Sequence, residues 1–232
     1  MPVYCGSRNY RPSPIEEPHL ASALLQRLHD VFAQDTLVQS LQEQNPCPPV
    51  GERRQAAVLL ALTDEESPRL LMIRRALNLP THPGEIAFPG GKRDEEDSDV
   101  FATALREAWE EVALPSESVS YVGMLEPRVS LTDLHVTAIV GVIPPNLPLR
   151  AHAGEVAEIL FVPLSFFADP KNLRADRILW NGEERITARF QFEHYTIWGL
   201  SGRFIVDLTN RLYNAGLDVE LRAQQALAEG HI

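Results

Sequence analysis

The stretch that decides the fold lies near the middle of this 232-residue chain, and it reads Arg106-Glu107-Ala108-Trp109-Glu110-Glu111-Val112-Ala113-Leu114. It ends a segment, residues 100–113, whose spacing predicts a helix. At about 100° per residue the apolar side chains gather on one side, which we expect to be the core face: Phe101, Leu105, Ala108, Trp109 and Val112. Glu107, Glu110 and Glu111 gather on the other side of the helix, within an arc of about 100°.

Three carboxylates on one helical face repel one another. Each like-charge pair at i,i+3 or i,i+4 destabilises a helix by about 0.2–0.5 kcal/mol. A solvated face tolerates this cost, and most charge runs on helices are solvated faces. A hard divalent cation such as Mg²⁺ or Mn²⁺ would instead turn the repulsion into coordination, because both ions take carboxylate oxygens. The helix alone leaves both interpretations open.

The residues before the helix favour the second interpretation. They read Gly84-Glu85-Ile86-Ala87-Phe88-Pro89-Gly90-Gly91-Lys92-Arg93-Asp94. A Pro-Gly-Gly turn lets the backbone approach a ligand closely. The acids from Asp94 to Asp99 suit the positive end of the helix that follows. We expect Arg106 either to fix a neighbouring carboxylate through a bidentate pair or to form a surface salt bridge.

Elsewhere the pattern mixes strands and helices without a regular βαβ repeat, which favours an α/β or α+β sandwich over a doubly wound sheet. Apolar and β-branched runs predict strands at residues 55–63, 70–73, 119–125, 134–143, 159–162, 186–192 and 195–198. The first two are expected to form a hairpin. Further helices are expected at residues 19–44 and 201–213. The breaker Asn45-Pro46-Cys47-Pro48-Pro49 predicts a linker between an N-terminal helical extension, residues 1–49, and a domain over residues 50–232.

The composition argues against several classes of function and location for this chain. The 32 acidic and 21 basic residues give a formal net charge of −11, which disfavours nucleic acid and anionic membrane as partners. Two cysteines, Cys5 and Cys47, are too few for a disulfide framework, and the N-terminus lacks the pattern of a signal peptide. The longest apolar run, Ala56 to Leu62, is far shorter than the roughly 20 residues that span a bilayer. We therefore expect a cytoplasmic protein, and a homodimer is left open.

These motifs resemble the box of the Nudix hydrolases, Gly-x5-Glu-x7-Arg-Glu-U-x-Glu-Glu-x-Gly-U, where U is a bulky aliphatic residue. Asp97 stands for the first Glu, one residue further from Arg106, and Ala113 stands for the last Gly. The longer spacing is similar to the coenzyme A pyrophosphatase branch. An upstream signature of that branch is matched by Leu71, Arg75, Ala76, Gly84, Phe88, Pro89, Gly90 and Gly91. The resemblance covers about residues 50–215.

The resemblance implies a Nudix-type α/β/α sandwich with a mixed sheet, and a hydrolase of nucleoside diphosphate compounds. The branch implies coenzyme A or its thioesters as substrate, cut to 4′-phosphopantetheine and adenosine 3′,5′-bisphosphate. It implies Mg²⁺ or Mn²⁺ held by three acids, Glu107, Glu110 and Glu111.

The resemblance also implies which residues act as the general base, position the metal ligands and bind the phosphates. Glu107 or an acid outside the box takes the proton of the attacking water, with Glu155 the first outside candidate and Glu158 the second. Arg106 holds a box carboxylate in place, and Asp97 orients the box or acts through water. The phosphates are expected to meet Arg75, Gly90, Gly91 and Lys92, with Arg74 and Arg128 as further basic candidates.

Two alternatives stay open. One keeps the fold and changes the substrate to ADP-ribose, NADH or a nucleotide sugar. The other is a Nudix-like binding module without catalysis, against which the complete set of Arg106, Glu107, Glu110 and Glu111 argues.

Overall fold

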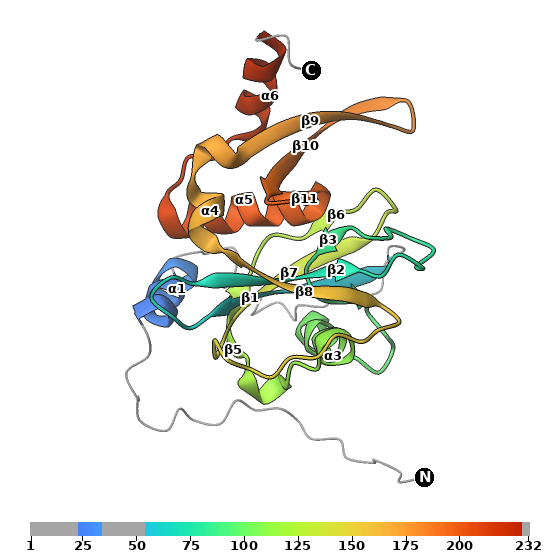
Figure 1. Ribbon diagram of the computed structural model, residues 1–232, viewed down its shortest axis with the longest axis vertical. Coiled ribbons are helices and arrows are strands. Elements are labelled where there is room, and N and C mark those ends of the chain that lie inside the picture. The colour runs from blue at the N-terminus through green and yellow to red at the C-terminus, as the bar shows by residue number, and fades with distance from the viewer. Residues whose placement is uncertain (1–22, 34–53, 229–232) are drawn as a thin grey trace.

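The structure, a computed structural model, describes residues 23–33 and 54–228 (Figure 1). The first helix, α1, runs over Ala23–Ala33 within the segment expected to be helical. The rest of that expected helix, the Pro-rich linker and both cysteines lie outside the described residues. No helix among residues 23–33 and 54–228 is both long and apolar enough to cross a membrane.

The main sheet is mixed, as the family resemblance implies. Its strands are β1 (Gln55–Thr63), β2 (Arg69–Arg75), β3 (Ile86–Ala87), β4 (Gly90–Lys92), β5 (Ser120–Met124), β6 (Arg128–Val129), β7 (His135–Ile143) and β8 (Val156–Pro163). The central strands β1 and β7 are parallel along their whole length, and the other pairs are antiparallel. β1 is an almost unbroken apolar run because both of its faces are buried.

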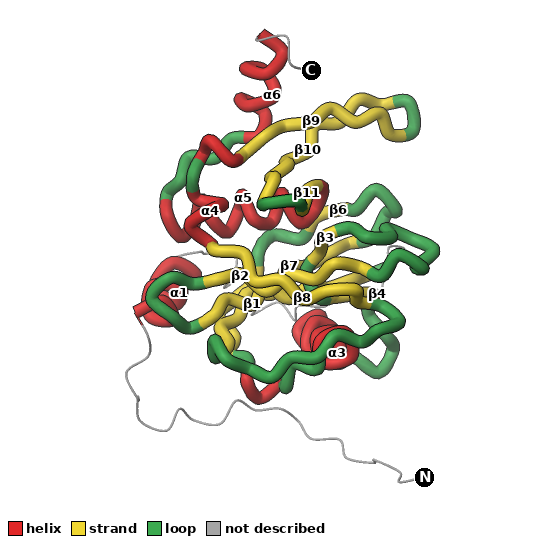
Figure 2. The backbone as a smooth tube through the Cα atoms, in the orientation of Figure 1, coloured by secondary structure: helices red, strands yellow, loops and turns green. Residues whose placement is uncertain are grey.

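Helices cover both faces of this sheet, which confirms the expected sandwich (Figure 2). Successive strand residues point to opposite faces, so Leu59 and Ala61 of β1 pack with the core beneath α3 (Val100–Val112). Leu60 and Leu62 pack on the other side, with the core that includes α1 and α5 (Gly199–Tyr213). The short helix α4 (Leu164–Ala168) joins that second core.

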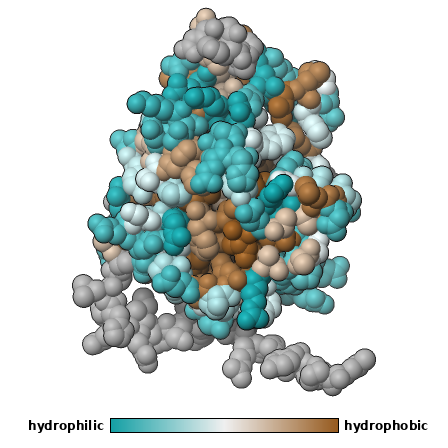
Figure 3. All heavy atoms as spheres, viewed as in Figure 1, coloured by the Kyte–Doolittle hydropathy of each residue, from teal (hydrophilic) through white to brown (hydrophobic). Residues whose placement is uncertain are grey.

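A second, three-stranded sheet follows β8 in the chain. Its strands are β9 (Leu173–Trp180), β10 (Glu183–Phe192) and β11 (Tyr195–Trp198), and the last helix, α6, spans Val219–Ala228. β9 and β10 form a long antiparallel hairpin that projects from the molecule (Figure 1). Figure 3 shows an apolar patch at the end of this hairpin, where Leu179 is 77% exposed.

The main sheet opens next to the stretch that the sequence singled out. β1 and β2 meet only where Leu62 lies opposite Leu70, so the expected hairpin forms at its turn and then diverges. The segment over residues 86–92 fills the opening, with β3 paired to β2 and β4 paired to β1. A Cβ at Gly90 would lie 2.3 Å from the Ala57 carbonyl oxygen. Glycine is therefore required there for the segment to lie against β1.

Candidate active site

Helix α3 has well-defined ends that fix its position over the opening. Asp99 caps its start, because its carboxylate accepts a hydrogen bond of 2.8 Å from the Ala102 N–H. Ala113 ends it in the left-handed conformation, with φ 55° and ψ 36°. This is the helix end that Gly favours in the family box, and here Ala adopts it.

The buried face of α3 is rotated relative to the sequence prediction. Ala104, Ala108 and Val112 lie in the core as apolar side chains should, but Trp109 is 57% exposed, so its placement on the core face was wrong. The face turned toward the sheet instead includes Glu111, which is only 2% exposed. Apolar periodicity misplaced the face because it assigns every acid to solvent, whereas a buried polar group is the more informative observation.

Glu111 is a buried carboxylate with few compensating partners. The Gly90 N–H donates a hydrogen bond of 2.9 Å to its Oε2, and Arg75 Nη1 lies 3.9 Å from its Oε1. Burial raises the pKa of Glu111 to about 8, and the nearby charges of Glu107 and Glu155 act in the same direction. The Gly90 N–H and Arg75 oppose this shift only in part.

Glu107 lies beside Glu111 and next to the glycine turn. Its side chain is 15% exposed, and burial raises its pKa although Arg106 acts in the opposite direction. A Cβ at Gly91 would lie 2.3 Å from Glu107 Oε1. The second glycine of the Pro-Gly-Gly turn therefore leaves the space that the Glu107 carboxylate occupies.

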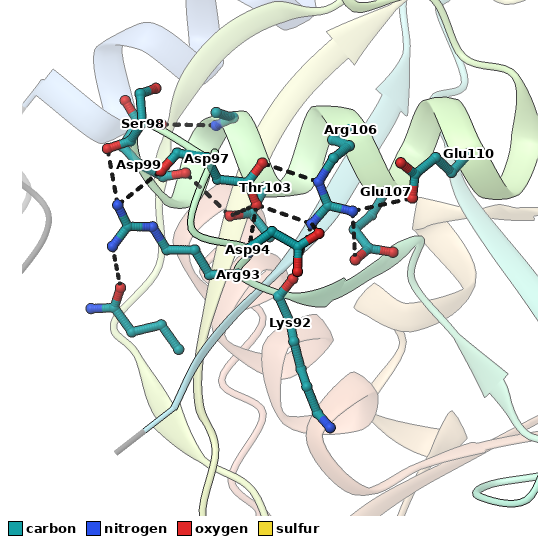
Figure 4. Close-up of polar contacts among 12 residues, drawn as sticks. Lys92, Arg93, Asp94, Asp97, Ser98, Asp99, Thr103, Arg106, Glu107 and Glu110 are labelled. Carbon is teal, nitrogen blue, oxygen red and sulfur yellow. Dashed lines mark hydrogen bonds and ion pairs between the residues drawn. The ribbon is translucent and has the colours of Figure 1, made fainter. Parts of the chain in front are cut away.

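Arg106 connects the loop before the helix with the helix acids (Figure 4). Its Nε and Nη2 donate to the two carboxylate oxygens of Asp97, each at 3.0 Å, and Nη2 also donates to the Lys92 carbonyl oxygen at 3.0 Å. Nη1 donates to Glu107 at 3.0 Å and to Glu110 at 3.1 Å. The predicted bidentate pair is thus formed with Asp97, and the same guanidinium also holds Glu107.

Asp97 is the residue whose role the sequence left least defined. It is buried, and its carboxylate also accepts hydrogen bonds from the Asp94 N–H at 3.0 Å and the Thr103 hydroxyl at 2.9 Å. Burial alone would raise the pKa of Asp97, but the bonds from Arg106, Asp94 and Thr103 outweigh it and the pKa is lowered. The one signal for this role was the position of Asp97 in the resemblance to the box.

The loop that carries Glu155 is fastened to the end of α3. The His152 N–H donates to the Glu111 carbonyl oxygen and the Arg150 N–H to that of Val112, both at 2.9 Å. These bonds satisfy carbonyls that a helix end leaves unpaired. Glu155 itself is about half exposed, and its charge reaches both Glu107 and Glu111.

Other candidate residues lie apart from this carboxylate cluster. The Glu110 side chain is 51% exposed and turned to Arg106, and the Lys92 side chain points away from α3 (Figure 4). Glu158 accepts a hydrogen bond of 2.7 Å from the Tyr195 hydroxyl. Arg128 forms a bidentate pair with Asp207 of α5, at 2.7–2.9 Å, so its guanidinium already has an anionic partner.

The arrangement fits a divalent cation. Within the described part of the chain no three metal-ligating side chains already surround one point. Glu107 and Glu111 are nevertheless both held largely out of water at the same turn, and the charge of Glu107 helps to raise the pKa of Glu111. A cation offsets that cost directly, because Mg²⁺ and Mn²⁺ bind carboxylate oxygens.

Known proteins resemble this chain in sequence. Residues 53–179 match the family profile described as NUDIX domain. The uncharacterized Nudix hydrolase NudL of Enterobacter sp. strain 638 is 42% identical over 159 residues, which cover 68% of this chain and 83% of that protein. NudL of Salmonella paratyphi B is 39% identical over 156 residues, which cover 67% of this chain and 81% of that protein. A solved MutT/nudix family protein from Enterococcus faecalis aligns over 84% of this chain and 75% of that chain, with 15% identity and a TM-score of 0.47.

Proposed function

Because the chain belongs to the Nudix family and is a pyrophosphohydrolase of a nucleoside diphosphate derivative, we propose that its substrate is coenzyme A or a coenzyme A thioester. The bond cleaved is the pyrophosphate bond, and the products are 4′-phosphopantetheine and adenosine 3′,5′-bisphosphate. Mg²⁺ or Mn²⁺ is the proposed cofactor.

The observation that carries the catalytic part of this proposal is the burial of Glu111 beside Glu107. Glu107 and Glu111 would hold the cation, and Glu110 would join them after leaving Arg106. When bound, the cation neutralises phosphate charge and lowers the pKa of a coordinated water. A binding module has no need for three metal-ligating acids, so the set of Glu107, Glu110 and Glu111 favours catalysis over binding alone.

Chain residues supply the remaining steps. Glu155 is exposed at the edge of the carboxylate cluster and is proposed to accept the proton of the attacking water. Glu107 is the second candidate for that role. Arg106 keeps the Glu107 carboxylate in place through its bonds to Asp97.

Arg75 supports the assignment to the coenzyme A branch, because it is part of the upstream signature and also borders the site. Its Nη1 lies 3.9 Å from Glu111, and its buried Nε has no hydrogen-bond partner in the described structure. An unfilled donor at this position suits a phosphate oxygen. The next signature residue, Ala76, donates its N–H to the Glu155 carbonyl oxygen at 2.9 Å, so the signature also positions the proposed base.

A substrate panel tests the proposal. Coenzyme A, acetyl-coenzyme A, ADP-ribose, NADH and a nucleotide sugar are each incubated with the protein and Mg²⁺ or Mn²⁺, and the products are identified by mass. We expect the two coenzyme A compounds to have the highest kcat/KM and to release 4′-phosphopantetheine or its acyl form. If coenzyme A is the slowest substrate, the branch assignment is wrong, and if nothing is hydrolysed with either metal, catalysis itself is contradicted.

A further inference from the structure

Arg74 is a half-buried cation that the proposed reaction does not use. It is the last residue but one of β2, and a register irregularity separates it from Arg75. Within the residues that the structure describes, its guanidinium has no hydrogen-bond or ion-pair partner. Holding a cation partly out of water without an acceptor is costly, so the position suits a ligand that supplies one.

The two arginines lie on opposite faces of the sheet. Arg75 faces α3 and approaches Glu111. Arg74 follows Leu70 and Met72 at intervals of two, and these side chains pack in the core on the other face, together with Tyr195 of β11. The hydrogen bond to Glu158 raises the pKa of Tyr195, and the charge of Arg74 is near enough to the Tyr195 hydroxyl to oppose that shift in part.

The acid closest in register to Arg74 is already engaged. Glu158 of β8 lies opposite Arg74 in the sheet, but its carboxylate accepts the hydrogen bond from Tyr195. No ion pair joins Glu158 to Arg74 among the described residues. Tyr195 therefore helps to leave the guanidinium available, and the Glu158 carboxylate leaves acceptor capacity for a hydroxyl or amino group of a ligand.

We propose that Arg74 binds a second anionic group of the substrate, a phosphomonoester distant from the bond that is cleaved. The five N–H donors of a guanidinium match the oxygens of a phosphate. This inference rests on the proposed function, in which the 3′-phosphate on the ribose of coenzyme A is the group that fits. Arg75 would then serve the scissile diphosphate and Arg74 the 3′-phosphate.

The test compares two substrates that differ only in this phosphate, coenzyme A and 3′-dephospho-coenzyme A. Wild type is compared with Arg74→Gln, with Arg74→Lys, which keeps the charge and loses the fork, and with Arg185→Gln. Arg185 is a half-exposed control on the β10 hairpin. We expect Arg74→Gln to raise KM for coenzyme A about 10- to 100-fold at unchanged kcat. Turnover of the dephospho compound should stay unchanged, Arg74→Lys should give an intermediate effect, and Arg185→Gln should have none.

Equal effects on both substrates, or no effect on either, would overturn the role of Arg74. If wild type hydrolyses neither compound, the proposed substrate is wrong. Whether Arg74 binds a phosphomonoester is then tested separately, by measuring the equilibrium binding of two nucleotides. Adenosine 3′,5′-bisphosphate should bind more tightly than adenosine 5′-monophosphate to wild type, and Arg74→Gln should abolish that preference. A wild-type protein that binds the two alike, or binds neither, contradicts the inference.

Discussion

At the scale of one residue, the most informative feature of the site is the buried carboxylate of Glu111. The side chain is 2% exposed, its nearest cation lies 3.9 Å away, and its pKa is raised from 4.5 to about 8 mainly by burial. Natural proteins seldom keep a carboxylate in such surroundings unless it is paired or binds a metal. The residue is therefore expected to lower stability in the absence of a cation and to bind one when it is supplied.

A pH series on the metal-free protein tests this expectation. The folded-state pKa of Glu111 lies above its ordinary value, so the contribution of Glu111 to folding is fully present below about pH 4.5 and is lost as the pH rises to about 8. The free energy of unfolding should fall over this range more steeply in wild type than in Glu111→Gln, as measured by urea denaturation with a chelator present. Adding Mg²⁺ should stabilise wild type more than the variant. Parallel pH profiles would contradict the burial of an ionisable group here.

The pKa of Asp97 is shifted in the opposite direction to that of Glu111, so its effect on stability changes with pH in the opposite way. Its pKa is lowered because hydrogen bonds outweigh its burial, so it stabilises the fold at neutral pH and loses that contribution as the pH falls through the folded-state pKa. Asp97→Asn should cost about 1–3 kcal/mol at pH 7, because it weakens the pair with Arg106.

Asp94→Asn is the matched control for this prediction. Asp94 is 63% exposed and lies 3.7 Å from the same guanidinium, and an exposed pair contributes at most about 1 kcal/mol. Denaturant unfolding of both variants measures the difference. Equal destabilisation by Asp97→Asn and Asp94→Asn would show that the buried pair contributes no more to the free energy of unfolding than the exposed one.

Individual residues show what the sequence could and could not predict about the site. The resemblance to the box singled out four residues that the structure brings together, Glu107, Glu111, Gly90 and Gly91, and their roles stay proposals. Trp109 was misplaced because a periodicity argument treats every large apolar side chain as core. The pairing of Arg128 with Asp207 was not predicted, because the two residues are 79 positions apart in sequence.

At the scale of elements, the C-terminal end of α3 carries a measurable strain. Ala113 adopts φ 55°, a left-handed conformation that costs a residue with a Cβ about 1–2 kcal/mol. Ala113→Gly should therefore raise the free energy of unfolding by about 1 kcal/mol. Thermal unfolding provides the measurement.

Asn214 ends α5 in the same conformation, with φ 49° and ψ 44°, and serves as the comparison for Ala113. Asn tolerates left-handed backbone better than Ala does. The gain from Asn214→Gly should accordingly be smaller than the gain from Ala113→Gly. A destabilised Ala113→Gly protein would show that the αL end is not strained.

Elements were predicted well where one signal dominated. The β-branched run of β7 and the breaker-free apolar run of β1 gave strands close to those observed. β9 was missed because the alternation of Leu173–Trp180 stops after its first four residues, where two charged residues and then three apolar residues stand in a row. β3 and β4 were not predicted, because strands of two and three residues leave no periodic pattern.

At the scale of the whole molecule, the pair of Arg128 and Asp207 links the main sheet to α5. Arg128 lies on β6 and Asp207 on α5, and their bidentate contact is partly exposed. Removing either partner should cost about 1 kcal/mol, the upper end for an exposed pair. A double-mutant cycle of Arg128→Gln and Asp207→Asn should give a coupling energy of about 0.5–1 kcal/mol. Strictly additive effects would show that the link contributes nothing.

We propose above all that Glu111 belongs to a metal-dependent centre that hydrolyses coenzyme A. The most direct measurement is the turnover of coenzyme A as Mg²⁺ is titrated, with products identified by mass, for wild type and for Glu111→Gln. We expect wild type to release 4′-phosphopantetheine only with the metal, and the variant to be slower by about 100-fold or more, since metal coordination supplies several kcal/mol to the transition state. Undiminished turnover by a folded Glu111→Gln protein, or turnover that persists in wild type after chelation, would contradict the claim.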